Sequence, residues 1–228
     1  MTESVQGRIG CRVRFDIERP AATLTAELGA FGSSMLADGM NRFNGLDPSV
    51  RPIRPGWKVA GPAVTVRVRA ADNLMVMRAI GIAQPGDVLV IATGRHHRNA
   101  VWGELTTLAA RKRGLAGVVT DGAARDIELL RTMDFPVFAA AFAPTACDKD
   151  GPGEINFPVS VGDVVVMPGD LVVADDDGVV VLPFADRDDL LTGIRAKIES
   201  ESRRRQEIES GVVVPDAVVA AVEARTRR

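Results

Sequence analysis

One stretch of the chain decides its fold. It runs from Asp87 to Phe142 and reads DVLVIATGRHHRNAVWGELTTLAARKRGLAGVVTDGAARDIELLRTMDFPVFAAAF. Short valine-rich runs alternate with helical spacing, and Gly114 is placed to end the first helix as a left-handed residue. Such alternation predicts an α/β fold with a parallel sheet, right-handed crossovers and helices covering a face. The predicted order is strand Asp87–Thr93, helix Gly103–Arg113, strand Gly117–Thr120, helix Ala124–Thr132 and strand Val137–Phe142.

The flanking sequence adds elements on both sides of this βαβαβ core. The chain after Pro20 is predicted to be mostly helical as far as about Asp47. In the last third, Pro and Gly turns separate short valine-rich runs, which predicts a small antiparallel β unit. The run Asp175 to Gly178 lacks the spaced ligands of a calcium loop and is predicted to be a hairpin turn. The remaining predicted elements are a half-buried strand over Trp57–Val68, a helix over Asn73–Ala83, strands over Val164–Met167, Leu171–Ala174 and Val179–Leu182, and a charged helix over Asp186–Glu209 with an apolar stripe of Leu190, Leu191, Ile194 and Ile198.

Composition narrows the class of protein. The 228 residues carry 28 Lys and Arg against 30 Asp and Glu, and the net charge of −2 argues against direct nucleic-acid binding through bulk positive charge. With 46% apolar and 25% charged residues, the chain is expected to fold as a globule. The sequence has neither a bilayer-length apolar run nor an apolar stretch near its start, so we expect a cytoplasmic protein with no membrane partner. Cys11 and Cys147 are expected to be reduced thiols.

Several catalytic strategies lack the residues that they need. The chain has no Tyr, and its only histidines are the adjacent His96 and His97, so HExxH zinc sites and histidine cages are excluded. No G-x-S-x-G, G-x-G-x-x-G or G-x-x-x-x-G-K-[ST] motif occurs, which leaves a serine triad and the usual nucleotide loops without support. Of the four lysines, Lys149 lies in a polar loop and only Lys58 is a candidate for Schiff-base chemistry. Carboxylates and arginines remain abundant.

Two turns at the carboxyl ends of neighbouring strands carry the candidate site. The first holds Gly103, Glu104, Leu105 and Thr106, where a helix start offers free N–H groups to an anion. The second holds Arg125 with Asp126, and twenty residues, one crossover unit, separate Glu104 from Arg125. We therefore expect both turns to face one pocket.

That pocket suits a small anionic keto acid bridged by a hard divalent cation. Mg²⁺ keeps several waters and needs only one or two protein carboxylates, so no dedicated cage is required. The metal would polarise a carbonyl, Arg125 would stabilise the developing enolate oxygen, and Glu104 would hold a water for proton transfer. The alternative is that Glu104 and Asp126 are ordinary acids at helix starts, with Arg125 as their surface partner.

Seven stretches in the same order make the sequence resemble the RraA-like proteins and the class II 4-hydroxy-4-methyl-2-oxoglutarate (4-carboxy-4-hydroxy-2-oxoadipate) aldolases. The resemblance covers residues from about 30 to 211 and implies one domain over residues 1–228, with a core at about 30–185 and a C-terminal helical extension at about 186–228. The matching stretches are Gly61–Thr65, Asp72-Asn73, Pro85–Val88, Trp102–Leu105, Gly114–Asp126, Phe135–Phe138 and Pro168–Pro183.

The resemblance implies a role for each site residue. The amides around Leu105 and Thr106 would hold the pyruvyl carboxylate, Arg125 would contact the keto oxygen, and Asp126 would be the direct ligand of Mg²⁺ or Mn²⁺. Glu104 stands where the family usually has Asp. The implied fold is a three-layer β/β/α swivelling domain, assembled as a homotrimer or homohexamer with the pocket between subunits. A neighbour's C-terminal helix would then supply Glu201.

The implied reaction is retro-aldol cleavage of a 4-hydroxy-2-oxo diacid to pyruvate and a second oxo acid, with oxaloacetate decarboxylation as a side activity. His96 and His97, flanked by arginines, either bind a substrate carboxylate or form a solvated basic loop. The resemblance also leaves a different class open, because RraA itself is a regulator that binds and inhibits an endoribonuclease without doing chemistry. An intact set of Glu104, Arg125 and Asp126 favours the enzyme.

Overall fold

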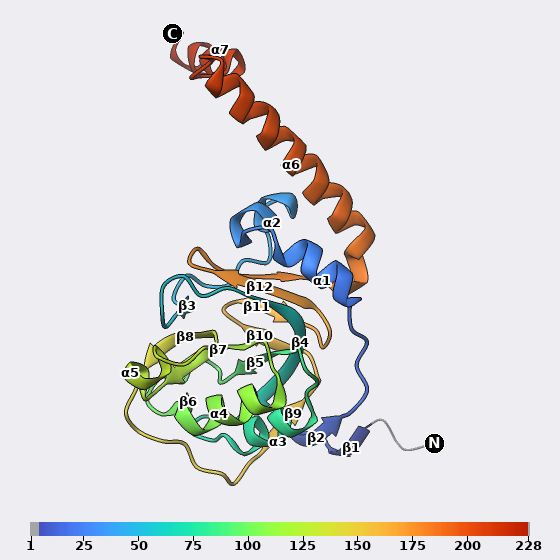
Figure 1. Cartoon of the computed structure of the whole chain (residues 1–228), viewed down its shortest axis with the longest axis vertical. Helices are drawn as coiled ribbons and strands as arrows, with labels where there is room; N and C mark the ends of the chain where they lie inside the picture. The colour runs from blue at the N-terminus through green and yellow to red at the C-terminus, as the bar shows by residue number, and fades with distance from the viewer. Residues whose placement is uncertain (1–4, 228) are drawn as a thin grey trace.

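The computed structural model describes residues 5–227, apart from the side chains of residues 187–189. Its helices lie on two sides of a β-rich body, and a long C-terminal helix projects from that body (Figure 1). The strands are β1 Val5–Arg8, β2 Cys11–Arg14, β3 Arg51–Pro52, β4 Val59–Val68, β5 Val88–Ala92, β6 Ala100–Trp102, β7 Gly117–Ala124, β8 Val137–Phe142, β9 Gly153–Ile155, β10 Val159–Val161, β11 Val164–Val166, β12 Leu171–Asp175 and β13 Gly178–Leu182. The helices are α1 Ala22–Gly29, α2 Ser33–Gly39, α3 Leu74–Ile82, α4 Glu104–Arg113, α5 Ile127–Leu130, α6 Arg187–Glu209 and α7 Asp216–Thr226, with a 3-10 turn at Phe184–Asp186.

The predicted parallel core is confirmed. Strands β4, β5, β7 and β8 are neighbours in one sheet and pair in parallel, with β4 joining at the edge of the predicted unit. Helix α4 ends at Gly114, which adopts φ +85° as the sequence predicts. The sheet continues in antiparallel pairing to β9 on one side and β3 on the other. The chain therefore has the α/β architecture expected from its alternating pattern.

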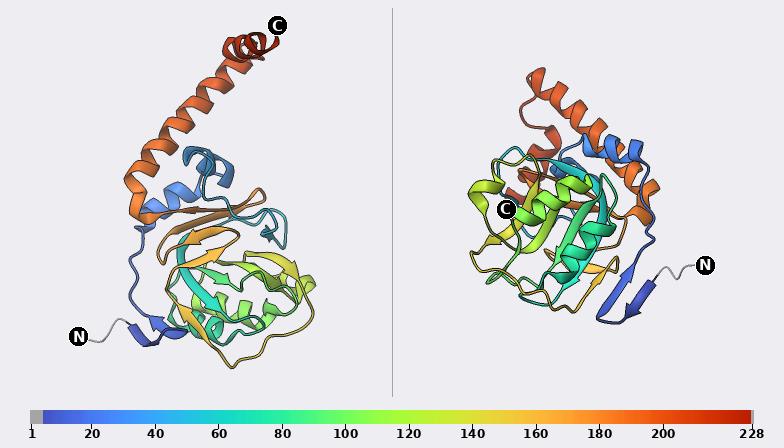
Figure 2. Two further views of the ribbon diagram at one scale, coloured as in Figure 1. Left: turned by 180° about the vertical axis from the view of Figure 1, so that it is seen from behind. Right: turned by 60° about the horizontal axis from the view of Figure 1, so that its bottom comes forward.

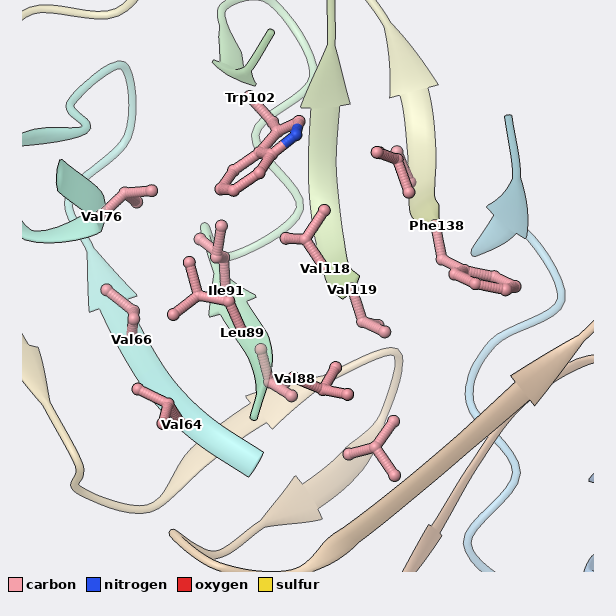
Figure 3. Close-up of a cluster of buried hydrophobic side chains, with 14 of the residues drawn as sticks. Val64, Val66, Val76, Val88, Leu89, Ile91, Trp102, Val118, Val119 and Phe138 are labelled. Atoms are coloured by element: carbon pink, nitrogen blue, oxygen red, sulfur yellow. The ribbon is translucent and has the colours of Figure 1, made fainter. Parts of the chain in front are cut away.

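Strand β4 is more buried than its alternating sequence predicts. Instead of exposing one face, it buries nearly every side chain except Arg67. Helix α3 packs on one face of the sheet, while β10 to β13 bring valines to the other, so both faces of β4 belong to the core. Figure 3 shows Val64 and Val66 of β4 among the side chains of the neighbouring strands. Polar residues in an alternating strand therefore did not mark a solvent face here.

The hairpin of β12 and β13 separates two apolar cores. The alternate residues Val172 and Val181 join the main core, whereas Val173 and Val180 face α1, α2 and α6. This follows from the two-residue period of a strand, which sends successive side chains to opposite faces. The apolar stripe of α6, with Ile194 at its centre, packs on the second core. The predicted antiparallel pairing is thus confirmed for β12 and β13, whereas β11 pairs with β10 in a separate two-stranded sheet and β12 also pairs with β4.

Two elements at the carboxyl edge of the sheet differ from prediction. Strand β7 continues through Ala124 instead of stopping at Thr120, because β6 and β8 pair with its extension. The predicted helix Ala124–Thr132 is accordingly reduced to the single turn of α5. The segment between β5 and α4, for which no strand was predicted, contains the short strand β6. The last residue of β6, Trp102, is buried against Phe135 with ring centroids 6.2 Å apart.

The described chain begins with the hairpin β1–β2, which the sequence pattern did not indicate, and ends with α6, which was predicted as a charged helix, and α7. The hairpin β1–β2 is held to the sheet by the buried carboxylate of Glu154, which accepts hydrogen bonds from Gly10 N–H and from the guanidinium groups of Arg12 and Arg67. At the other end, α6 carries α7 away from the body (Figure 2). None of the helices within residues 5–227 combines the length and apolar content needed to cross a bilayer.

Candidate active site

The two predicted turns lie side by side because β6 and β7 end together. Trp102 pairs with Ala124 in the sheet, and Arg125 N–H donates to the carbonyl of Trp102 at 3.0 Å. Gly103 follows Trp102, and Arg125 and Asp126 follow Ala124, so the two turns start at neighbouring positions. Trp102 also donates its Nε1–H to Thr107 Oγ1 at 2.8 Å, which fixes the start of α4 relative to the sheet.

Gly103 permits the close approach of these turns. Its backbone is extended, with φ −168° and ψ −163°, so the backbone conformation alone does not require glycine. A Cβ at this position would lie 2.7 Å from Asp126 Oδ2 and 3.0 Å from Arg125 Cγ. Glycine is needed at residue 103 because the side chains of the second turn occupy the space of a Cβ.

Asp126 caps the neighbouring helix rather than its own. It adopts a left-handed conformation with φ +59°, and its Oδ2 accepts the N–H of Glu104, the first residue of α4, at 3.0 Å. The same oxygen lies 3.5 Å from Arg125 Nε, and both side chains are about two-fifths exposed. A carboxylate at a helix N-terminus is stabilised by the helix dipole. Asp126 is thus fixed by α4 and Arg125 while remaining open to solvent.

A small cavity lies beside Arg125, at the N-terminus of α4. Its volume is about 110 Å³. Arg125 lines it together with Glu104, Leu105 and Thr106 of the first turn of α4. First-turn amides have no intrahelical acceptor, so those of Leu105 and Thr106 are available to an anion. Arg125 and these amides form an anion-binding corner.

Sequence reasoning missed four other residues that line this cavity. Asn73, which precedes α3, and Met77 of α3 line it, as do Cys147 and Lys149 from the loop between β8 and β9. Lys149 was set aside as a residue of a polar loop, yet it brings a second positive charge to the cavity. Burial, followed by the carboxylates of Asp72 and Asp148, raises the pKa of Cys147 to about 11. That thiol is therefore a poor nucleophile at neutral pH.

An open groove of about 500 Å³ lies on the other side of Glu104, lined also by Asp126 and Leu129. Glu104 lines both the groove and the cavity, and among the described residues its carboxylate makes no hydrogen bond or ion pair. Asp126 uses Oδ2 for the contacts described above, which leaves Oδ1 for another partner. The carboxylates of Glu104 and Asp126 therefore both border the open groove, and each has an oxygen available to accept another partner.

This donor set fits only one kind of metal ion. Within residues 5–227, no three His, Cys, Asp or Glu side chains gather closely enough to hold a metal by themselves. Zinc sites with three or four protein ligands are not matched. Mg²⁺ or Mn²⁺ held by Asp126, with Glu104 bound through water, is compatible, because hard cations keep several waters beside one or two carboxylates.

The histidine pair does not line the cavity. His96 Nε2 lies 3.0 Å from Asn99 Oδ1, and His97 Nε2 lies 2.9 Å from the carbonyl of Asp121. His97 is exposed, and the neighbouring Arg95 pairs with Asp163. Of the two predicted alternatives, these contacts agree with a basic surface loop.

Glu201 lies on α6, which projects from the side of the body opposite α4 (Figure 1). Its carboxylate is 3.4 Å from Lys197 Nζ on the same helix. Glu201 therefore cannot serve the site of its own chain, and only a neighbouring subunit could bring it there.

A larger hollow elsewhere is a weaker candidate. It measures about 620 Å³ and lies against α1 and the start of β4. Its charged lining residues, Arg19 and Asp87, bind each other at 2.8 and 2.9 Å and are thereby satisfied. The smaller cavity, with unpaired amides and two cations, is the better candidate for an anionic ligand.

Comparison with known proteins identifies relatives of two kinds. Residues 33–181 match the family model described as RraA-like, Aldolase/RraA. A protein of Halalkalibacterium halodurans, provisionally named 4-hydroxy-4-methyl-2-oxoglutarate aldolase, is 35% identical over 181 residues, covering 79% of this chain and 86% of that protein. The RNA-processing inhibitor RraA of Thermus thermophilus superposes with a TM-score of 0.62 at 32% identity, over 67% of this chain and 93% of its own. An uncharacterised protein of Pseudomonas syringae gives a TM-score of 0.73 at 26% identity, over 86% and 92% of the two chains.

Proposed function

The chain belongs to the RraA-like family, and from that membership we propose that it is a divalent-metal-dependent pyruvate aldolase. This lyase cleaves a 4-hydroxy-2-oxo diacid, such as 4-hydroxy-4-methyl-2-oxoglutarate, to pyruvate and a second oxo acid. The observation that carries the proposal is the meeting of the Arg125 guanidinium, the Asp126 carboxylate and the first-turn amides of α4 at one place.

Each group has a task in retro-aldol cleavage. The amides of Leu105 and Thr106 bind the substrate's 1-carboxylate, because free N–H groups at a helix start attract anions. The C4 hydroxyl loses its proton, the C3–C4 bond breaks, and its electron pair moves towards the C2 keto oxygen. Arg125 stabilises the negative charge that develops on that oxygen. Glu104 holds the water through which protons leave the hydroxyl and return to C3.

The proposal includes a hard divalent cation. Asp126 is its protein ligand, with Glu104 in the outer shell, and the carboxylates are sufficient only if water completes the coordination. A bound Mg²⁺ or Mn²⁺ supplies Lewis-acid polarisation of the keto group. Asp126 is suited to this task because α4 and Arg125 already hold its carboxylate in one position.

A diacid substrate is favoured by a second cation. Lys149 lines the same cavity as Arg125 but comes from the loop between β8 and β9, so the cavity offers a second positive group to the second carboxylate of a diacid. Oxaloacetate has the same two carboxylates, and its decarboxylation also places negative charge on the keto oxygen of pyruvate. The same residues therefore support an oxaloacetate decarboxylase side activity.

We also propose that the protein is a homotrimer or homohexamer. Leu105, Leu129 and Phe142 are 71%, 42% and 55% exposed around the site, and monomers rarely expose clustered large apolar side chains. A neighbouring subunit that covers them would narrow the open groove and could bring its Glu201 to the site. Light scattering coupled to size-exclusion chromatography tests this assembly directly.

The second candidate is a regulator of the RraA kind that binds an endoribonuclease without doing chemistry. The specific observation in its favour is the structural match to the RNA-processing inhibitor at 32% identity. The same exposed apolar side chains would then serve as a surface for another protein. An anion-binding corner with an adjacent, spare carboxylate oxygen has no use in such a regulator, and this places the enzyme first.

The discriminating experiment measures pyruvate release from 4-hydroxy-4-methyl-2-oxoglutarate and from oxaloacetate, with Mg²⁺, with Mn²⁺ and with EDTA. We expect metal-dependent release and a loss of about 10²–10³-fold in kcat for Arg125→Ala. Arg125→Lys should recover little, because lysine lacks the planar fork of the guanidinium. Arg111→Ala, in the exposed last turn of α4, is the matched control and should retain full activity. Absent turnover, together with binding to an endoribonuclease, would favour the regulator.

A further inference from the structure

A buried carboxylate outside the proposed site ties two distant segments together. Asp72 is 1% exposed and lies just before α3. Its Oδ1 accepts the N–H of Leu74 at 2.9 Å, and its Oδ2 accepts those of Asp150 and Gly151 at 2.8 and 2.9 Å. The first bond is local, whereas the other two reach the loop between β8 and β9, 78 and 79 residues further along the chain. We refer to Asp72 and these three N–H groups as the clamp.

Backbone hydrogen bonds reinforce the clamp. Asp148 N–H donates to the carbonyl of Ala71 at 2.8 Å, and Asn73 N–H donates to the carbonyl of Asp148 at 3.0 Å. The loop has little other regular structure, since its residues 143–152 belong to no strand or helix. Its position against the start of α3 therefore depends strongly on these bonds.

The clamp stands behind one wall of the candidate site. Asn73 lines the cavity from the start of α3, where it is the N-cap residue, while Cys147 and Lys149 line it from the loop. Asp72 itself does not line the cavity. The other lining residues, Arg125 and the first turn of α4, follow β6 and β7 and make no contact with Asp72. The loop also touches the β6 side directly, because Ala100 N–H donates to the carbonyl of Thr145 at 2.7 Å and Asn99 Nδ2–H donates to that of Ala146 at 2.7 Å. Asp72 therefore adds the support on the α3 side, next to Lys149.

We infer that Asp72 is a positioning residue, which fixes the loop wall so that Lys149 meets the second carboxylate of the substrate. The assignment of a substrate rests on the proposed function, whereas the assignment of the clamp does not. A loosened clamp should weaken contacts to the distal end of a diacid and leave the pyruvyl end intact. Contacts made equally in the ground state and the transition state change KM rather than kcat.

The kinetic test uses Asp72→Asn, which keeps the shape of the side chain but replaces one acceptor oxygen with a donor NH₂. Asp72→Ser is the second variant, because a serine hydroxyl can still accept from the residue two positions on but is too short to hold the loop. For both we expect KM for the diacid to rise about tenfold with kcat within about threefold. The inhibition constant of pyruvate, which occupies only the Arg125 end, should change less than about twofold.

Asp170→Asn is the matched structural control. Asp170 is likewise buried and accepts two backbone N–H groups, from Met167 and Phe184, but it lies in another turn. Loss of an acceptor oxygen in Asp170→Asn should lower the melting temperature without changing KM for the diacid.

A second readout tests the clamp without any turnover. In a Cys11→Ser background, Cys147 is the only thiol, and its rate of reaction with a maleimide reports how well the loop wall is closed. Removing Asp72 also removes a negative charge that raises the pKa of Cys147, and Asp148→Asn controls for that effect. Asp148 raises the same pKa, and its side chain makes no hydrogen bond within the described residues. We expect Asp72→Asn and Asp72→Ser to react at least about tenfold faster than wild type, and Asp148→Asn less than about threefold faster.

The outcomes separate the two proposals. Thiol rates for Asp72→Asn and Asp72→Ser no higher than that for Asp148→Asn would overturn the clamp. Faster thiol reaction with an unchanged KM, or a KM that rises equally in Asp170→Asn, would overturn the positioning role. If the wild type cleaves no diacid, the proposed function fails, and the thiol rates still decide whether Asp72 holds the wall.

Discussion

Substitution of Gly103 by alanine tests the site with one added methyl group. The backbone at residue 103 is extended, so alanine can adopt it and the effect is steric. The new Cβ would lie 2.7 Å from Asp126 Oδ2, whereas ordinary contact begins near 3.4 Å, so the carboxylate must retreat by about 0.7 Å. The 3.0 Å bond from Glu104 N–H to that oxygen would then exceed hydrogen-bonding distance.

A displacement of this size has a predictable cost. Misplacement of a catalytic group by about 1 Å can lower the rate about 10²-fold. We therefore expect kcat/KM for pyruvate release from a 4-hydroxy-2-oxo diacid to fall about 10–100-fold, equivalent to about 1.4–2.7 kcal/mol of transition-state stabilisation. Folding should change little, since reduced freedom of the unfolded chain contributes about 0.4–1 kcal/mol and opposes the new crowding.

The assay compares Gly103→Ala with Gly45→Ala under saturating Mg²⁺. A Cβ at Gly45 meets nothing within 4 Å and the backbone there has no positive φ, so this control should keep wild-type kcat/KM. Thermal unfolding of both variants shows whether the fold is retained. A folded Gly103→Ala protein with more than half of the wild-type kcat/KM would refute the reasoning, because the position of Asp126 would then not matter to the reaction.

Other predictions concern stability. Burial alone would raise the pKa of Glu154, but the Gly10 N–H and two guanidinium groups outweigh it and hold that pKa below its ordinary value. Its stabilisation is therefore complete above about pH 4.3 and is lost as pH falls through the folded pKa, so urea unfolding should show a steeper acid loss in wild type than in Glu154→Gln. Gly81→Ala, where a Cβ meets only a side-chain nitrogen at 3.6 Å, should stabilise α3 by about 0.5–1 kcal/mol and raise the melting temperature by about 1–4 °C. Gly193→Ala should instead destabilise by about 1–3 kcal/mol, because its Cβ would lie 2.5 Å from the Gly39 carbonyl oxygen where α6 crosses α2; an increase in melting temperature would contradict that packing.

The local sequence pattern predicted a strand or helix correctly wherever contacts with neighbouring elements did not change that strand or helix. The strand, helix and strand from Val88 to Val119 lie where the spacing of apolar residues predicts them, and Gly114 has the predicted left-handed conformation. The pattern was insufficient for β4, since alternation records which residues are polar but not how many layers the strand will lie between. It also failed at α5, where pairing with β6 and β8 extended β7 through residues of neutral preference.

The residues of the candidate site likewise fall into those that the sequence predicted and those that only the structure revealed. Glu104, Arg125 and Asp126 were predictable because consecutive parallel strands end at one edge of a sheet, which places their following turns together. The same argument does not identify Asn73, Cys147 or Lys149, because they come from α3 and from a loop after the last parallel strand. Asp72 with Asn73 was noticed only as part of a family pattern, and nothing in that dipeptide indicates a contact with residues 150 and 151.

By itself, the sequence determined the α/β class, the family and the turn that holds Arg125 and Asp126, because these depend on spacing along the chain and on residues close together in it. Only the tertiary structure decided that Asp126 would cap α4, that Gly103 would have no room for a side chain, and that a loop almost eighty residues beyond Asp72 would close the cavity. These features depend on contacts between segments whose relative position is set by sheet register and layer packing. Those quantities have no local signature, since the pairing free energy that fixes them exists only once the partners have met.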